Sequence, residues 1–112
     1  MATLEYYVNG QYVSSDQASL SVEDLGLVRG YGVFDLLRTY EHAPFKLREH
    51  IQRLERSAQG IGIDLPRTTE EIERIVNTVN DRNELANASI RIVVTGGTSP
   101  SFMMPQRQPS LI

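Results

Sequence analysis

The sequence of 112 residues has no cysteine, no tryptophan, a single lysine (Lys46) and two histidines (His42 and His50). Without cysteine there is no disulfide framework, no thiolate zinc site and no cysteine nucleophile. Two histidines are too few for a metal cluster built on imidazole, so no metal site is predicted. Any chemistry must therefore rest on other side chains.

Long apolar runs are also missing. No stretch approaches the roughly 20 apolar residues of a membrane span, and the first five residues have neither the basic start nor the apolar core of a secretory signal. Acidic residues number 14 against 11 basic ones, whereas binding to nucleic acid or to an anionic membrane favours a basic surface. We therefore expect a cytoplasmic protein with no nucleic acid or membrane as its partner.

The first half of the chain shows short strands and turns. Asn9-Gly10 lies between two runs rich in tyrosine and valine, which predicts a β-hairpin because both turn residues tolerate positive φ. Ser21 to Asp24 has the form of a capped helical turn. Residues 33–40 alternate as a strand, and a turn at 41–44 leads to a short strand expected at 45–47.

The second half predicts two helices and a strand. Apolar residues recur at helical spacing from Arg48 to about Gln59 and again from Thr69 to about Arg82. Residues 89–95 then alternate as a strand, with Ile90, Ile92 and Val94 on one face. The predicted fold class is α+β, an antiparallel sheet with two helices packed on one side.

Two motifs carry a resemblance to a known family. One is Gly30-Tyr31-Gly32-Val33-Phe34-Asp35, and the other is Glu49-His50-Ile51-Gln52-Arg53-Leu54 on the first helix. In this order and spacing the chain resembles the small N-terminal domain of the fold type IV pyridoxal-phosphate (PLP) enzymes. These are the branched-chain aminotransferases, D-amino acid transaminases and aminodeoxychorismate lyases.

The resemblance implies a function and a cofactor. Family members use PLP held as a Schiff base by a lysine from a second domain, act on amino acids and 2-oxo acids, and form homodimers. We expect residues 1–100 to be the N-terminal domain of a branched-chain-like aminotransferase and residues 101–112 to be a tail that leads toward an absent PLP-lysine domain. Lys46 lies outside the family's lysine context, so no catalytic residue is predicted, and the isolated chain is expected to be inactive and not to hold PLP. An aminodeoxychorismate lyase-type enzyme and a non-catalytic binding module that keeps the fold are the alternatives.

Arg53 is the predicted cofactor-binding residue. Without further context, an arginine four residues after Glu49 on a helix predicts a surface ion pair between the two side chains. In the resembled family, however, the arginine of this motif binds the PLP phosphate, which suits the fork of donors that a guanidinium presents. His50 is expected to orient Arg53 or to pack with a satisfied hydrogen bond, since no nucleophile stands near it to activate.

Four residues are predicted to bind substrate. The resemblance places Phe34 against the substrate side chain and Arg91 near its carboxylate, while Arg29 and Tyr31 in the glycine loop could reach the carboxylate. Phenylalanine at position 34 favours the branched-chain members over the D-amino acid members. For Arg91, a buried pair with Asp35 or another acid is an equal alternative, because a charge on a half-buried strand needs a partner.

The segment Thr95-Gly96-Gly97-Thr98-Ser99-Pro100 resembles another family loop. In D-amino acid transaminases an arginine and a histidine after this loop bind the substrate carboxylate. Ser101 and Met103 stand at those positions here. The difference argues against a D-amino acid substrate of that type.

Overall fold

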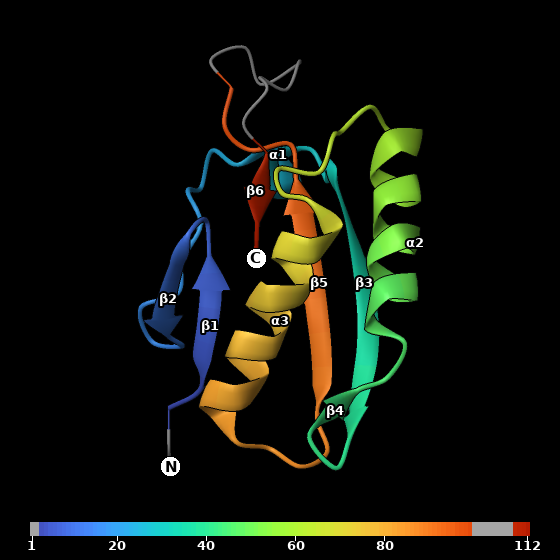
Figure 1. Cartoon of the computed structure of the whole chain (residues 1–112). Coiled ribbons are helices and arrows are strands. Elements are labelled where there is room, and N and C mark those ends of the chain that lie inside the picture. The colour runs from blue at the N-terminus through green and yellow to red at the C-terminus, as the bar shows by residue number, and fades with distance from the viewer. Residues whose placement is uncertain (1–2, 100–108) are drawn as a thin grey trace.

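The computed structural model describes residues 3–99 and 109–112 (Figure 1). Its strands and helices follow the chain as β1 (Glu5–Val8), β2 (Gln11–Ser14), α1 (Leu25–Val28), β3 (Gly32–Tyr40), β4 (Ala43–Pro44), α2 (Leu47–Gly60), α3 (Thr69–Asn83), β5 (Ser89–Thr95) and β6 (Ser110–Leu111). β1 and β2 form the expected hairpin around Asn9 and Gly10, both of which have positive φ. The other strands form an antiparallel sheet in the order β4-β3-β5-β6.

Helices α2 and α3 cover one side of this sheet, with α2 along β3 and α3 beside α2 and β1 (Figure 1). This is the predicted α+β architecture. The core lies between the two layers and consists of Leu37, Ile51, Leu54, Ala58, Ile72, Val76, Ile92 and Val94, together with flanking apolar residues. Burial of these side chains is the main force that holds the helices on the sheet.

The expected strand at 45–47 is wrong. Lys46 has φ 53° and ψ 43°, a left-handed conformation that ends extended pairing, and Leu47 begins α2. The pairing partner of β3 is instead β4, where Pro44 faces Thr39 and Ala43 faces Tyr40. Three residues are too few for alternation to separate a strand from the first turn of a helix.

The start of α3 is well defined. Thr68 accepts a hydrogen bond from the Glu71 amide at 3.2 Å, and the Glu71 carboxylate accepts one from the Thr68 amide at 3.1 Å. This reciprocal capping box satisfies two amides that the helix leaves without partners. The cap therefore fixes the residue at which α3 begins.

The chain returns to the sheet at β6. Ser110 pairs with Thr95 and Leu111 with Val94, while the amide of Asn9 donates to the Leu111 carbonyl at 3.0 Å. β6 therefore joins the hairpin to the main sheet. Of the expected tail at 101–112, residues 101–108 lie outside the described residues. No helix among the residues described is long and apolar enough to cross a bilayer.

Candidate functional site

Alternation along β3 sends successive side chains to opposite sides of the sheet. Val33, Asp35 and Leu37 face the helices, whereas Phe34, Leu36 and Arg38 face away from them and are exposed. Asp35 thus enters the layer between β3 and α2, where its side chain is only 3% exposed. A carboxylate at that depth needs charged or polar partners.

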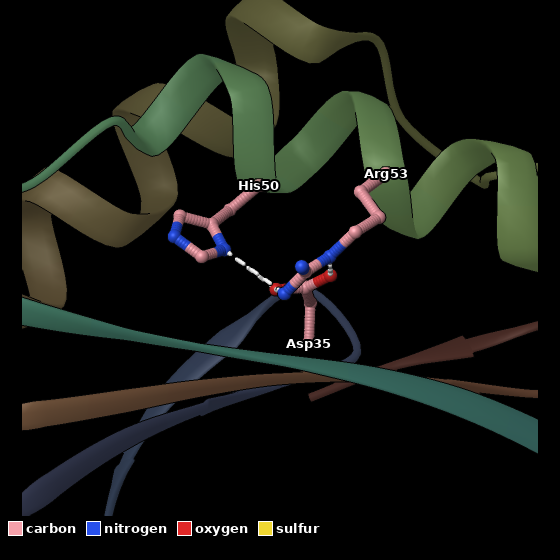
Figure 2. A network of polar contacts seen from close by, with 3 residues as sticks. All are labelled: Asp35, His50 and Arg53. Carbon is pink, nitrogen blue, oxygen red and sulfur yellow. Dashed lines mark hydrogen bonds and ion pairs between the residues drawn. The ribbon is translucent and has the colours of Figure 1, made fainter.

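Two side chains of α2 supply those partners (Figure 2). Nε of Arg53 donates to Oδ2 of Asp35 at 2.7 Å, and Nη2 of Arg53 donates to Oδ1 at 2.8 Å. His50 contributes a contact of 2.7 Å between its Nδ1 and Oδ1 of Asp35. Residues 50 and 53 are one helical turn apart, so both reach the same carboxylate from above.

The contact from His50 has a defined direction. An ionised carboxylate only accepts hydrogen bonds, so Nδ1 of His50 carries a proton and donates a hydrogen bond to Asp35. The nearby Nη2 of Arg53, at 3.5 Å from Nδ1, then has no acceptor there. His50 therefore orients the carboxylate that in turn orients Arg53, in agreement with the expected orienting role.

These contacts determine the charge state of the pair. The pKa of Asp35 is lowered from 3.8, chiefly because Arg53 donates to the carboxylate, with burial acting in the opposite direction and His50 adding to the lowering. The same hydrogen bond raises the pKa of Arg53. Asp35 is ionised and Arg53 protonated at neutral pH. The partner of Arg53 is therefore Asp35 and not Glu49.

Arg53 is held firmly and yet remains accessible. Its side chain is 59% exposed, and the two bonds to Asp35 use Nε and Nη2, which leaves Nη1 outside the pair. A guanidinium fixed on one edge and open on the other has the donors that an anion such as a phosphate requires. The residues present thus fit the phosphate of PLP.

Phe34 and Arg91 meet on the opposite side of the sheet. The guanidinium carbon of Arg91 lies 5.7 Å from the centre of the Phe34 ring, which is within cation–π range. The register places Arg91 opposite Leu36 and Val93 opposite Phe34. The expected pair of Arg91 with Asp35 is therefore wrong, because the two residues lie on different faces of the sheet.

Arg29 and Tyr31 are placed differently. The Tyr31 hydroxyl donates to the carbonyl of Ile61 just beyond α2, and its ring packs against the core. Arg29 caps the exposed end of α1. The Tyr31 side chain therefore lies on the helix-covered side of the sheet, away from the Phe34–Arg91 pair.

The free edge of β3 connects the two faces. β4 pairs only with Thr39 and Tyr40, so among the described residues no strand adjoins β3 from Gly32 to Leu37 on that side. Arg53 lies above this edge and Phe34 below it.

Sequence reasoning assigned no site role to Asp35. Its position between Val33 and Leu37 on the inward face was the available signal, since a charge on that face requires a partner. Asp24, which is buried at the end of the sheet, was also missed as a structural centre. Ser101 and Met103 lie outside the described residues.

Known proteins resemble this chain over nearly its whole length. The family model of amino-transferase class IV matches residues 32–112. A D-alanine aminotransferase of Staphylococcus epidermidis is 36% identical over 109 residues, which is 95% of this chain and 39% of that protein. A putative branched-chain-amino-acid aminotransferase of Methanocaldococcus jannaschii is 40% identical over 104 residues, covering 93% of this chain and 36% of that protein.

Solved structures give the same result for the fold. The branched-chain aminotransferase of the archaeon Thermoproteus uzoniensis, determined with norvaline, superposes with a TM-score of 0.86 at 30% identity over 98% of this chain and 39% of that one. A branched-chain amino acid aminotransferase complexed with N-(5'-phosphopyridoxyl)-L-glutamate superposes with a TM-score of 0.85 at 27% identity. That match covers 97% of this chain and 40% of the other. The chain therefore spans about two fifths of the length of the relatives it matches.

Proposed function

Because this chain belongs to the amino-transferase class IV family, whose members depend on PLP and act on amino and 2-oxo acids, we propose that it is the N-terminal domain of an amino acid aminotransferase. Residues 1–100 form this domain together with β6, which returns to its sheet, and the complete enzyme has a further domain that carries the PLP lysine. The donor is a branched-chain-like amino acid and the acceptor a 2-oxo acid. The protein acts in the cytoplasm as a homodimer. Its molar mass in solution tests the dimeric state.

The observation that carries the proposal is the anchoring of Arg53 on Asp35. Asp35 and His50 fix the guanidinium before any ligand arrives, so little side-chain entropy is lost when a phosphate binds. Arg53 thereby holds the cofactor at the open edge of β3. When bound, PLP supplies the electron sink for amino-group transfer.

Phe34 and Arg91 form the substrate wall in this proposal. The exposed ring, with Leu36 and Val93 beside it, offers an apolar surface for an aliphatic side chain, and Arg91 offers a charge for a carboxylate. Arg29 and Tyr31 are secondary candidates, which rest on the resemblance alone. For Tyr31, contact with substrate requires its hydroxyl to leave the Ile61 carbonyl.

The 112-residue chain alone is expected to have no transaminase activity. Its single lysine, Lys46, is exposed at the start of α2, where Nζ lies 5.6 Å from the Phe45 ring. That position is separate from the Asp35–His50–Arg53 cluster. The chain alone is likewise expected not to retain PLP, because most of the cofactor pocket belongs to the second domain.

The test is an assay of the gene product that contains this chain together with any residues encoded after Ile112. Transfer of the amino group from L-leucine to 2-oxoglutarate is the expected result. The similarity to D-alanine aminotransferases makes D-alanine the second donor to assay. Release of pyruvate from aminodeoxychorismate would identify the lyase, and the absence of all these activities would indicate a binding module.

A further inference from the structure

Asp24 is a buried carboxylate outside the Arg53 cluster. It caps α1 and is 1% exposed. Its Oδ1 accepts from the Gly26 amide at 2.8 Å, and its Oδ2 accepts from the hydroxyls of Thr95 at 3.0 Å and Ser110 at 3.1 Å. One side chain thus connects three segments that are distant in sequence, namely α1, β5 and β6.

The hydroxyl of Thr95 extends this connection into the next loop. It accepts a hydrogen bond from the Gly97 amide at 3.1 Å while it donates to Asp24. A hydroxyl has one proton, and Asp24 as an acceptor-only group takes it, which leaves the oxygen lone pairs directed at Gly97. The carboxylate therefore sets the orientation of the hydroxyl that holds the loop.

Backbone contacts bring the same two loops together. The Leu25 amide donates to the Gly97 carbonyl at 2.8 Å, and the Gly96 amide donates to the Tyr31 carbonyl at 3.0 Å. A Cβ on Gly26 would lie 2.6 Å from Cγ2 of Thr95, so only glycine permits this approach. The loop after β5 and the loop before β3 are packed directly on each other.

The cluster adjoins the Phe34–Arg91 wall. Thr95 follows Arg91 and Val93 at alternate positions of β5, so its side chain lies on the same face of the sheet. It stands opposite Gly32, two residues before Phe34. A shift of the loop after β5 would therefore move the border of that wall.

We propose that Asp24 is a positioning residue that acts through the Thr95 hydroxyl to hold the loop at residues 96–99 against the segment at residues 29–31. Its role for substrate rests on the function proposed above, because that function makes the neighbouring face a substrate wall. The coupling from Asp24 through Thr95 to Gly97 is a property of the chain itself. Asp24 does not contact substrate.

Amide hydrogen exchange on the 112-residue chain tests this coupling, with the Gly97 amide as the reporter. Thr95→Val removes the hydroxyl and keeps the side-chain shape, and Asp24→Asn replaces an acceptor by a donor. Both variants are expected to raise Gly97 exchange by about fivefold to tenfold, the effect of one lost hydrogen bond. Exchange at Leu37 and Ile92 in the core measures global unfolding.

Two matched variants separate positioning from general stabilisation. Ser110→Ala also removes one hydroxyl donor from Oδ2 of Asp24, yet Ser110 has no bond to Gly97 among those described. Thr95→Ser keeps the hydroxyl and loses only the methyl group. Neither is expected to change Gly97 exchange relative to the core amides.

The role is overturned if Thr95→Val or Asp24→Asn leaves Gly97 unchanged, if Ser110→Ala raises Gly97 exchange equally, or if Thr95→Ser behaves like Thr95→Val. A variant that raises exchange at Leu37, Ile92 and Gly97 by one common factor also contradicts it, because the effect is then global. The measurement uses neither PLP nor substrate. Its failure leaves the proposed function standing, and failure of the transamination assay leaves the coupling standing.

Discussion

Asp35 shows how one buried carboxylate organises the candidate cofactor site. It receives two bonds from Arg53 and one from His50 in the layer between β3 and α2. The inward face of Asp35 follows from its place between Val33 and Leu37 in the alternation of β3. The partners of Asp35 on α2 cannot be predicted in this way, because alternation within one strand gives neither the register to the next strand nor the distance to a helix.

Asp35→Asn is expected to lower the free energy of unfolding by about 1 to 3 kcal/mol, since it weakens charge-assisted bonds to Arg53 and His50. Urea denaturation of the chain at neutral pH measures this change. Asp64→Asn, at an exposed position in the loop after α2, is the control and should be close to neutral. Equal stability of the Asp35→Asn variant and the wild type would contradict the importance of the cluster.

The lowered pKa of Asp35 also predicts a pH dependence. In the unfolded chain this carboxyl takes up a proton near its usual value of 3.8, whereas in the folded chain it remains ionised to lower pH. The unfolded state then binds more protons, so the contribution of Asp35 is fully present above that value and is lost as pH falls through the lowered pKa.

Urea titrations from neutral pH down to strongly acidic pH measure this dependence. The stability difference between wild type and Asp35→Asn should be constant above about pH 5 and should shrink below about pH 4. A difference that stays constant or grows on acidification would contradict the assignment.

Among the elements, the hairpin, the two long helices and β5 were predicted with bounds within one or two residues. Their signals are local: the Asn9-Gly10 turn, the helical spacing of Ile51, Leu54 and Ala58, and the alternation of β5. The short strand at 45–47 was wrong because the left-handed conformation of Lys46 depends on how α2 packs. The pairing of β6 and the bonds from Thr95 and Ser110 to Asp24 depend on distant segments and had no local signal.

The close packing of α1 on β5 predicts a contrast between two glycine substitutions. Gly26→Ala should destabilise the chain by about 1 to 3 kcal/mol, because the new Cβ overlaps Thr95. Gly60→Ala, where nothing lies within 4 Å of the added Cβ, should be neutral or stabilising by about 0.5 kcal/mol. Thermal denaturation compares them, and a Gly26→Ala chain as stable as the Gly60→Ala chain would refute the packing.

In the whole molecule, the sheet separates the two parts of the proposed site. The helix-covered side presents Arg53 on its Asp35 and His50 support, and the open side presents Phe34 and Arg91. Motif order and spacing in the sequence were enough to identify the family and the fold class. They were not enough to show that Arg53 lies over one face of an edge strand whose other face carries Phe34, because that arrangement requires the strand order.

The affinity of PLP for the gene product that contains this chain tests the account most directly, with Arg53→Lys compared with the wild type. Lysine keeps the charge but loses the fork that binds Asp35 and phosphate together, so the dissociation constant of PLP should rise by about tenfold or more. Arg56→Lys, an exposed neighbour on the same helix, should leave it unchanged. Equal PLP affinity of the Arg53→Lys variant and the wild type would contradict the role of Arg53 as the phosphate-holding residue.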